Sequence, residues 1–163
     1  MTINFVQLRL AERGDFDAVR SLLYDLDEIA YEAQKARVKP PHKSELTEAR
    51  FAAWLENRQT RVVVALHKDG IIGFSRVEVQ DRPETRTEPT QLILRIHEMI
   101  VRAKHRRRGV GALLFEDVSA LATHFDIDRI ELALPNFNEG AARFFEKQGL
   151  KTLVRMMGRE QEG

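Results

Sequence analysis

Cationic side chains and bare backbone lie together in the stretch KHRRRGVGALL, between Lys104 and Leu114. The residues concerned are three arginines and two glycines: Arg106, Arg107, Arg108, Gly109 and Gly111. Apolar residues at helical spacing follow, so the stretch is predicted to lead into a helix. Free N–H groups and the positive end of the dipole meet at a helix N-terminus. Because glycines let an anion approach these amides, the stretch predicts a loop that binds a phosphate group, with His105 adding positive charge.

Other functions of this stretch remain open. The segment GVGALL lacks the third glycine of a dinucleotide-binding fingerprint, and no Gly-Lys-Ser/Thr of a P-loop occurs in the sequence. A solvated basic turn is one alternative. A nucleic-acid-binding patch is another, although the formal net charge of +1 and the lack of interleaved aromatic residues argue against it.

A second motif follows about thirty residues later, in NEGAARFFEKQGL. Together the two segments resemble the GCN5-related N-acetyltransferase (GNAT) superfamily. The acetyl-CoA motif of that family, Arg/Gln-x-x-Gly-x-Gly/Ala, is matched by residues 106–111, and its second signature, Asn-x-x-Ala-x-x-Phe-Tyr-x-x-x-Gly-Phe, by residues 138–150. The matching positions of the second signature are Asn138, Ala141, Phe144, Phe145, Gly149 and Leu150. The resemblance is clear from about Gln91 to Val154.

The resemblance implies an N-acetyltransferase that uses acetyl-CoA as its co-substrate. The diphosphate would rest on the amides of residues 106–112, and the pantetheine arm would pair with the preceding strand, where a main-chain amide polarises the thioester. Asn138 would reach the arm from the other side of the cleft, or would simply cap a helix. The predicted cofactor-binding residues are Met99, Ile100, Val101, Arg106, Arg107, Arg108, Gly109, Val110, Gly111, Ala112, Asn138, Ala141 and Phe145.

Direct attack of an amine on the thioester needs a base, because only about one alkylamine in a thousand is unprotonated at neutral pH. Glu98 and His97 flank the expected thioester site and are the candidates. As neighbours in a strand they should face opposite sides of the sheet. Glu98 interrupts an apolar run at a position where many members of the family carry an acid, so it is preferred. Its alternative role is a structural ion pair with Arg95 or His97.

Phe145 departs from the family pattern, which has a tyrosine that protonates the leaving thiolate. Phenylalanine cannot donate a proton, but a thiolate is a tolerable leaving group at a pKa of about 8.5. Water, Tyr24 or Tyr31 could serve instead. The departure leaves a second function open, a catalytically weak acyl-CoA-binding module of the same fold.

Composition limits the class of protein. The chain has 163 residues, 43% of them hydrophobic, and no cysteine, which excludes disulfides, thiolate catalysis and Cys-ligated metals. We expect one domain over residues 1–163 and a cytoplasmic location. We expect the protein to bind no metal, no nucleic acid and no membrane. The expected partner is the amine of a small molecule or peptide, and the family commonly forms homodimers.

The elements that position these residues are predicted from periodicity. Strands are expected at residues 4–10, 61–67, 71–80, 91–101, 129–134 and 150–156. Helices are expected to begin at Asp15, at Ser44 (carrying Leu46, Ala49, Ala53 and Trp54 inward), at Gly109 and at Glu139. The first helix, the connection after it and a loop at residues 81–90 should choose the substrate. This order indicates an α/β (α+β) protein, a mixed, mostly antiparallel sheet flanked by helices on both faces, which is the GNAT fold.

Overall fold

Five strands form one sheet, in chain order, in a computed structural model that describes residues 5–42, 45–68 and 70–161. The strands are β1 (Gln7–Leu10), β2 (Thr60–His67), β3 (Gly70–Arg82), β4 (Gln91–Val101) and β5 (Arg129–Leu132). Neighbours pair antiparallel from β1 to β4, and β5 pairs parallel to β4. The predicted mixed, mostly antiparallel sheet is therefore confirmed.

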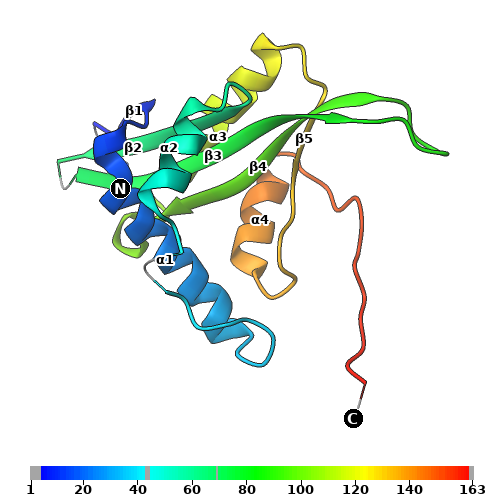
Figure 1. The fold of residues 1–163 in the computed structure, drawn as a ribbon, viewed down its shortest axis with the longest axis horizontal. Coiled ribbons are helices and arrows are strands. Elements are labelled where there is room, and N and C mark those ends of the chain that lie inside the picture. The colour runs from blue at the N-terminus through cyan, green and yellow to red at the C-terminus, as the bar shows by residue number, and fades with distance from the viewer. Residues whose placement is uncertain (1–4, 43–44, 69, 162–163) are drawn as a thin grey trace. The chain divides into compact units, whose positions relative to one another are not determined.

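The helices are α1 (Phe16–Ala33), α2 (Glu48–Glu56), α3 (Val110–His124) and α4 (Glu139–Lys147), labelled in Figure 1. Two short 3-10 turns precede α1 and α3, η1 (Arg13–Asp15) and η2 (Ala103–His105). The chain divides into two compact units. The first, Met1–Ala133, contains the whole sheet with α1, α2 and α3, and the second, Leu134–Gly163, contains α4.

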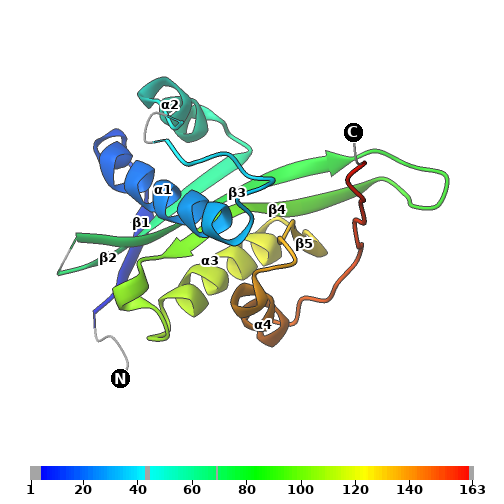
Figure 2. The ribbon, with the colours of Figure 1, turned by 90° about the horizontal axis from the view of Figure 1, so that it is seen from below.

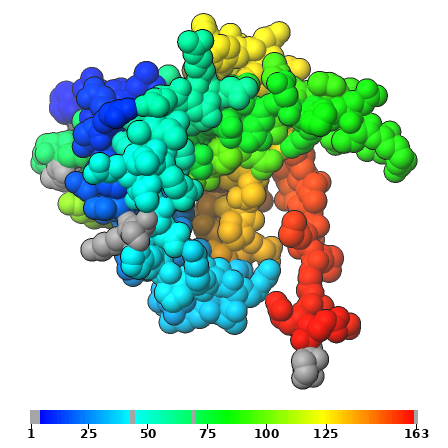
Figure 3. Space-filling view, in the orientation of Figure 1, coloured from blue at the N-terminus to red at the C-terminus, as the bar shows by residue number. Residues whose placement is uncertain are grey.

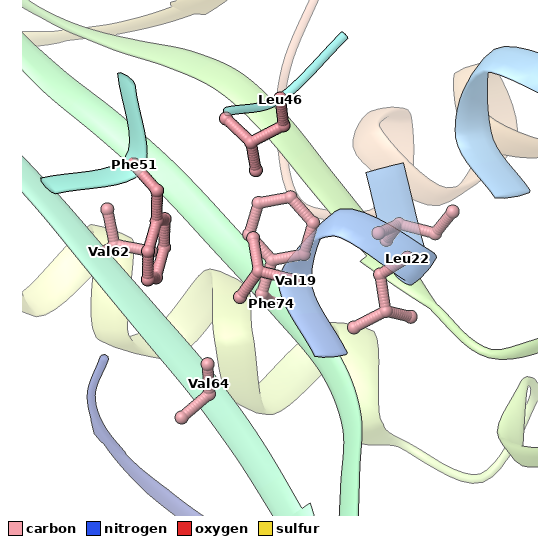
Figure 4. Close-up of a cluster of buried hydrophobic side chains, with 8 residues drawn as sticks. Val19, Leu22, Leu46, Phe51, Val62, Val64 and Phe74 are labelled. Atoms are coloured by element: carbon pink, nitrogen blue, oxygen red, sulfur yellow. The ribbon is translucent and has the colours of Figure 1, made fainter. Parts of the chain in front are cut away.

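Helices cover both faces of the sheet in the first unit, with α1 and α2 on one side and α3 on the other (Figure 2). The period of two in β2 produces this arrangement. Val62 and Val64 pack into a cluster with α1 and α2, whereas Val63 and Ala65 pack with the start of α3. Figure 4 shows the first cluster, in which side chains of α1 and α2 meet those of β2 and β3.

The inward side of α2 differs from the prediction. Ala49 and Ala53 are exposed, and the buried residue of the helix is Phe51, at 1% exposure. The reason is the position of the N-cap, since Thr47 accepts a hydrogen bond from the main-chain N–H of Arg50 and so starts the helix at Glu48. The expected cap, Ser44, lies outside the described residues.

Asp15 precedes α1 as predicted but does not cap it with its side chain. Its carboxylate accepts a hydrogen bond from the Glu12 main-chain N–H at 2.8 Å and two from the guanidinium of Arg9. The bonds from Arg9 lower the pKa of this carboxyl, against the opposing effect of burial. Asp15 therefore connects the turn that precedes α1 with strand β1.

The prediction of a final strand is wrong. Residues 150–161 have no regular secondary structure, and the apolar residues Val154, Met156 and Met157 are 82%, 99% and 92% exposed. The apolar pattern that indicated a strand is present, but a strand also needs an edge with which to pair, and no such pairing is formed within residues 70–161. Among the described helices, none is long and apolar enough to cross a membrane.

Candidate functional site

The pairing between β4 and β5 ends halfway along β4. Their parallel pairing runs from Ile93 opposite Arg129 to Ile96 opposite Leu132 and stops there. Over residues 97–101, β4 continues beside β3 only, so its other edge pairs with no strand of the described chain. Main-chain groups on such an edge can bind an extended ligand as an added strand. This is the segment that was expected to bind a pantetheine arm.

A pocket opens where the two strands part. It has a volume of about 270 Å³ and is lined by Gln80, Arg95, Ile96, His97 and Ala133. Ile96 belongs to the last strand pair, and His97 and Ala133 are the first residues beyond the paired segment of each strand. A pocket of this size accommodates a small polar group rather than a large ligand.

A β-bulge places His97 at this point. Ile96 lies opposite Val77 and Glu98 lies opposite Arg76, so His97 is an extra residue of β4. The bulge also overturns the expectation that His97 and Glu98 face opposite sides. His97 contacts Glu78 and Glu98 contacts Arg76, and these two β3 residues, two positions apart, share one face of the sheet.

Glu98 is held by Arg76 through two hydrogen bonds. The Nε and Nη2 atoms of Arg76 donate to the two carboxylate oxygens at 2.6 and 2.8 Å, and both side chains are less than one fifth exposed. The guanidinium lies 4.2 Å from the ring centroid of Trp54, so it is also held from the side of α2. The partner of Glu98 is therefore neither Arg95 nor His97.

His97 forms a pair with Glu78. Its Nε2 lies 2.6 Å from Oε2 of Glu78, and that oxygen also accepts a hydrogen bond from the side-chain amide of Gln80 at 3.0 Å. The bond from Gln80, followed by the interaction with His97, lowers the pKa of Glu78, while burial opposes the shift. An ionised Glu78 orients the ring so that Nδ1 remains to exchange a proton.

Sequence reasoning missed Asp27 of α1. Burial raises the pKa of its carboxyl, and the nearby carboxylates of Glu45 and Glu98 raise it further. A carboxyl whose pKa is raised by burial and by a neighbouring carboxylate is typical of active sites. Its spacing of four from Leu23, a residue of the apolar stripe, was the available signal that it turns toward the sheet.

The predicted phosphate loop leads into α3 through a glycine N-cap. Gly109 is the N-cap of the 15-residue helix α3 with φ of 88°, and no side chain caps the first N–H groups of that helix. Arg107 also adopts a left-handed conformation, with φ of 58°, which is uncommon outside glycine. Left-handed residues beside right-handed ones are typical of main-chain turns whose successive amides bind an anion.

The basic side chains around the loop differ in their roles. Arg107 and Arg108 are exposed, as a phosphate clamp requires. The Nε of Arg106 instead donates to the carbonyl of Val101 at 2.8 Å, so this carbonyl has one lone pair left for a ligand amide. The expectation that His105 adds surface charge is wrong, because it is 3% exposed and its ring lies 5.5 Å from that of His67.

The second motif lies in the second unit, within and beside α4. Asn138 is the N-cap of this helix, where its Oδ1 accepts a hydrogen bond from the Ala141 main-chain N–H at 3.1 Å. Phe145 is 8% exposed, and its ring meets that of Phe144 edge-on at 5.0 Å. The capping role of Asn138 is therefore present, and the roles of Asn138, Ala141 and Phe145 toward a coenzyme stay predictions.

The loop expected to choose the substrate lies at the tip of a long hairpin. Strand β3 continues to Arg82 and β4 starts at Gln91, so the loop is shorter than predicted. The hairpin projects as a narrow arm, green in Figure 3. At about 3.3 Å per residue, Gln91, where this loop ends, lies about 20 Å along β4 from His97.

Comparisons with known proteins agree with this geometry. The acetyltransferase (GNAT) family model matches residues 22–150. A tetramutant of the BH1408 protein from Bacillus halodurans is 23% identical, with 95% of this chain and 99% of that chain covered, at a TM-score of 0.89. A Trypanosoma brucei acetyltransferase is 21% identical, with 96% and 100% covered, at a TM-score of 0.68.

An aminoglycoside acetyltransferase from an uncultured soil metagenomic sample is 15% identical, with 98% of this chain and 99% of that chain covered, at a TM-score of 0.70. At these identities the solved structures show a common fold. No curated protein matches the sequence significantly.

Proposed function

This chain belongs to the acetyltransferase (GNAT) family, and we propose that it transfers the acetyl group of acetyl-CoA to a primary amine of a small molecule or peptide. The observation that carries the proposal is the coincidence of three features in the first unit. The open edge of β4 over residues 97–101, the bulge at His97 and the free amides at the start of α3 occur within fifteen residues of sequence. The strand edge and the amides suit two parts of the donor, and the bulge presents a candidate base for the amine.

The donor fits the described residues in two places. Its diphosphate would accept hydrogen bonds from the amides of residues 109–112, where the helix dipole adds positive charge. Its amide-bearing arm would pair with the outer edge of Met99, Ile100 and Val101, whose other edge is bonded to β3.

The chemical step is the attack of the amine nitrogen on the thioester carbonyl carbon. The carbon–sulfur bond breaks, coenzyme A leaves as a thiolate, and the surplus proton of the amine must go to a base. The geometry supports His97 for that role before Glu98, because both oxygens of Glu98 are bonded by Arg76, whereas His97 keeps one ring nitrogen for the proton. Both residues reach the same face, so Glu98 would stabilise the cationic amine.

The second unit is proposed to complete the same domain. The match to the family spans residues 22–150 and so crosses the boundary between the two units at Ala133 and Leu134. Phe145 cannot protonate the thiolate, and this supports an alternative, a module of the same fold that binds acyl-CoA with weak catalysis. Since thiolates leave readily near neutral pH, we propose the enzyme.

The test is a screen for release of coenzyme A with a thiol reagent, over amino acids, polyamines, peptides and aminoglycosides. Aminoglycosides belong in it because a structural neighbour carries the name of an aminoglycoside acetyltransferase. The chain has no cysteine, so the protein contributes no thiol signal. Amine-dependent release confirmed by mass of the N-acetyl product supports the proposal. Tight acetyl-CoA binding without release for any amine would favour the binding module.

A further inference from the structure

Arg95 lies at the pocket on the same face of the sheet as His97. It lines the pocket directly. In the register of the sheet it is opposite Glu78 on β3 and opposite Glu131 on β5. Because paired residues share a face, and His97 bonds Glu78, Arg95 and His97 lie on one side of β4. A substrate whose amine meets His97 would therefore have Arg95 within its reach.

Glu131 is a single carboxylate in contact with three arginine side chains. Arg82 donates to both of its carboxylate oxygens at 2.8 and 2.6 Å. The Nη1 of Arg129 approaches at 3.5 Å and the Nη2 of Arg95 at 3.6 Å. Three guanidinium groups thus surround one carboxylate that is 8% exposed, and together they lower its pKa. Glu78, a second acid on this face, is bonded to His97 and Gln80.

Arg95 is the surplus cation of this cluster. The oxygens of Glu131 already accept short bonds from Arg82, and the contact of Arg95 is an ion pair without a hydrogen bond. In the part of the chain that the structure describes, the side chain of Arg95 donates no hydrogen bond, although it is 27% exposed. A guanidinium with several free N–H groups at a pocket suits a carboxylate, which it binds through two parallel bonds.

We infer that Arg95 selects an acceptor whose amine is accompanied by a carboxylate, as in an amino acid or a peptide terminus. The inference rests on the proposed acetyl transfer and deepens it. The carboxylate would bind Arg95 in the pocket, while the amine meets His97 and the acidic side chains of Glu98 and Asp27. Arg95 and Glu98 therefore lie on opposite sides of His97 along one strand face, and they suit the two charges of such a substrate.

The experiment compares β-alanine with its carboxamide as acceptors, by release of coenzyme A at saturating acetyl-CoA. The two amines differ in the carboxylate alone, and the carboxamide supplies more free base at neutral pH, so chemical reactivity works against the acid. We expect kcat/KM to favour the acid by about 10- to 100-fold in the wild type, the value of a charge-assisted contact. In Arg95→Gln this preference falls toward one, because kcat/KM for the acid falls by more than kcat/KM for the carboxamide. Arg95→Lys keeps part of the preference.

Arg129→Gln is the matched control, because Arg129 contacts Glu131 at a similar distance without lining the pocket. It should retain the preference for the acid. A second readout, by calorimetry, does not depend on turnover. N-acetyl-β-alanine should bind to the complex of the wild-type protein with coenzyme A at least tenfold more tightly than the carboxamide of N-acetyl-β-alanine does. Arg95→Gln should abolish this difference in affinity.

Three results would overturn the inference. Acetylation of amines with no preference for the acid would refute it and leave the proposed function intact. An equal loss of preference in Arg129→Gln would show a diffuse field instead of a contact at the pocket. The third result is that no amine is acetylated and that the complex with coenzyme A does not prefer N-acetyl-β-alanine to its carboxamide. This result would refute the proposed function as well.

Discussion

Replacement of His97 by glutamine tests the catalytic part of the account. In the structure Nε2 of His97 lies 2.6 Å from the Glu78 carboxylate, so the neutral ring donates from Nε2 and keeps the lone pair of Nδ1. Glutamine can still donate to Glu78, but its amide cannot accept a proton at neutral pH. The variant therefore removes the base and retains the hydrogen bond that fixes the position.

The expected loss follows from the role. A positioned general base contributes about 10² to 10⁴ in rate, so we expect kcat for the best amine to fall by at least 100-fold in His97→Gln. The Kd for acetyl-CoA should change less than threefold, because its proposed contacts are the main-chain groups of residues 99–101 and 109–112. Any dependence of kcat/KM on pH that arises from this imidazole should disappear in the variant.

Glu98→Gln is the matched comparison. It breaks the pair with Arg76, in which both side chains are under one fifth exposed, and should lower the free energy of unfolding by about 1–2 kcal/mol. We expect kcat to fall less than tenfold. Rates measured from pH 5 to 9 for both variants, at saturating acetyl-CoA, decide between the residues. If Glu98→Gln loses more than 100-fold while His97→Gln stays within tenfold and keeps its pH dependence, the reasoning is refuted.

Three further predictions concern stability. Glu131→Gln should lower the free energy of unfolding by about 2 kcal/mol at pH 7. Because Arg82 lowers the pKa of Glu131, this deficit should shrink as the pH falls below the ordinary pKa of 4.5 and through the lowered pKa of the folded state. An equal deficit at pH 3 in urea titrations would contradict the prediction. Asp27→Asn should stabilise the protein at pH 7, because burial raises the pKa of Asp27 and disfavours its charged form. The gain in stability should vanish below pH 3.8, the ordinary pKa of the group, where the carboxyl is protonated in both the folded and the unfolded state. A lower Tm at pH 7 would contradict this prediction. Gly109→Ala should cost about 1 kcal/mol through its φ of 88° alone, because an added Cβ meets no atom within 4 Å, and a loss above about 3 kcal/mol would mean a clash.

The sequence predicted the elements of the first unit well because their signals are local. The apolar stripe of α1, the β-branched run of β2 and the apolar run of β4 were sufficient to predict these elements of the first unit. The glycine at the start of α3 was recognised because a left-handed N-cap and an uncapped helix end depend on a few neighbouring residues. The family resemblance, carried by two short motifs, is confirmed by the match over residues 22–150.

The features that failed depend on partners far apart in the chain. The bulge at His97 exists only in the register between β3 and β4, so alternation within β4 placed His97 and Glu98 on opposite faces. The partners of these residues, Glu78 and Arg76, are about twenty positions away and carry no motif. The expected final strand had the right composition, yet strand formation depends on an available edge, which composition does not encode.

Calorimetric titration of the intact protein with coenzyme A and with pantetheine tests the central claim, that the start of α3 binds the diphosphate of the donor. Pantetheine retains the arm that would pair with β4 but lacks the diphosphate. The account predicts that coenzyme A binds with a micromolar Kd and that pantetheine binds at least 100-fold more weakly. Equal affinities, or no heat from coenzyme A at millimolar concentration, would contradict it.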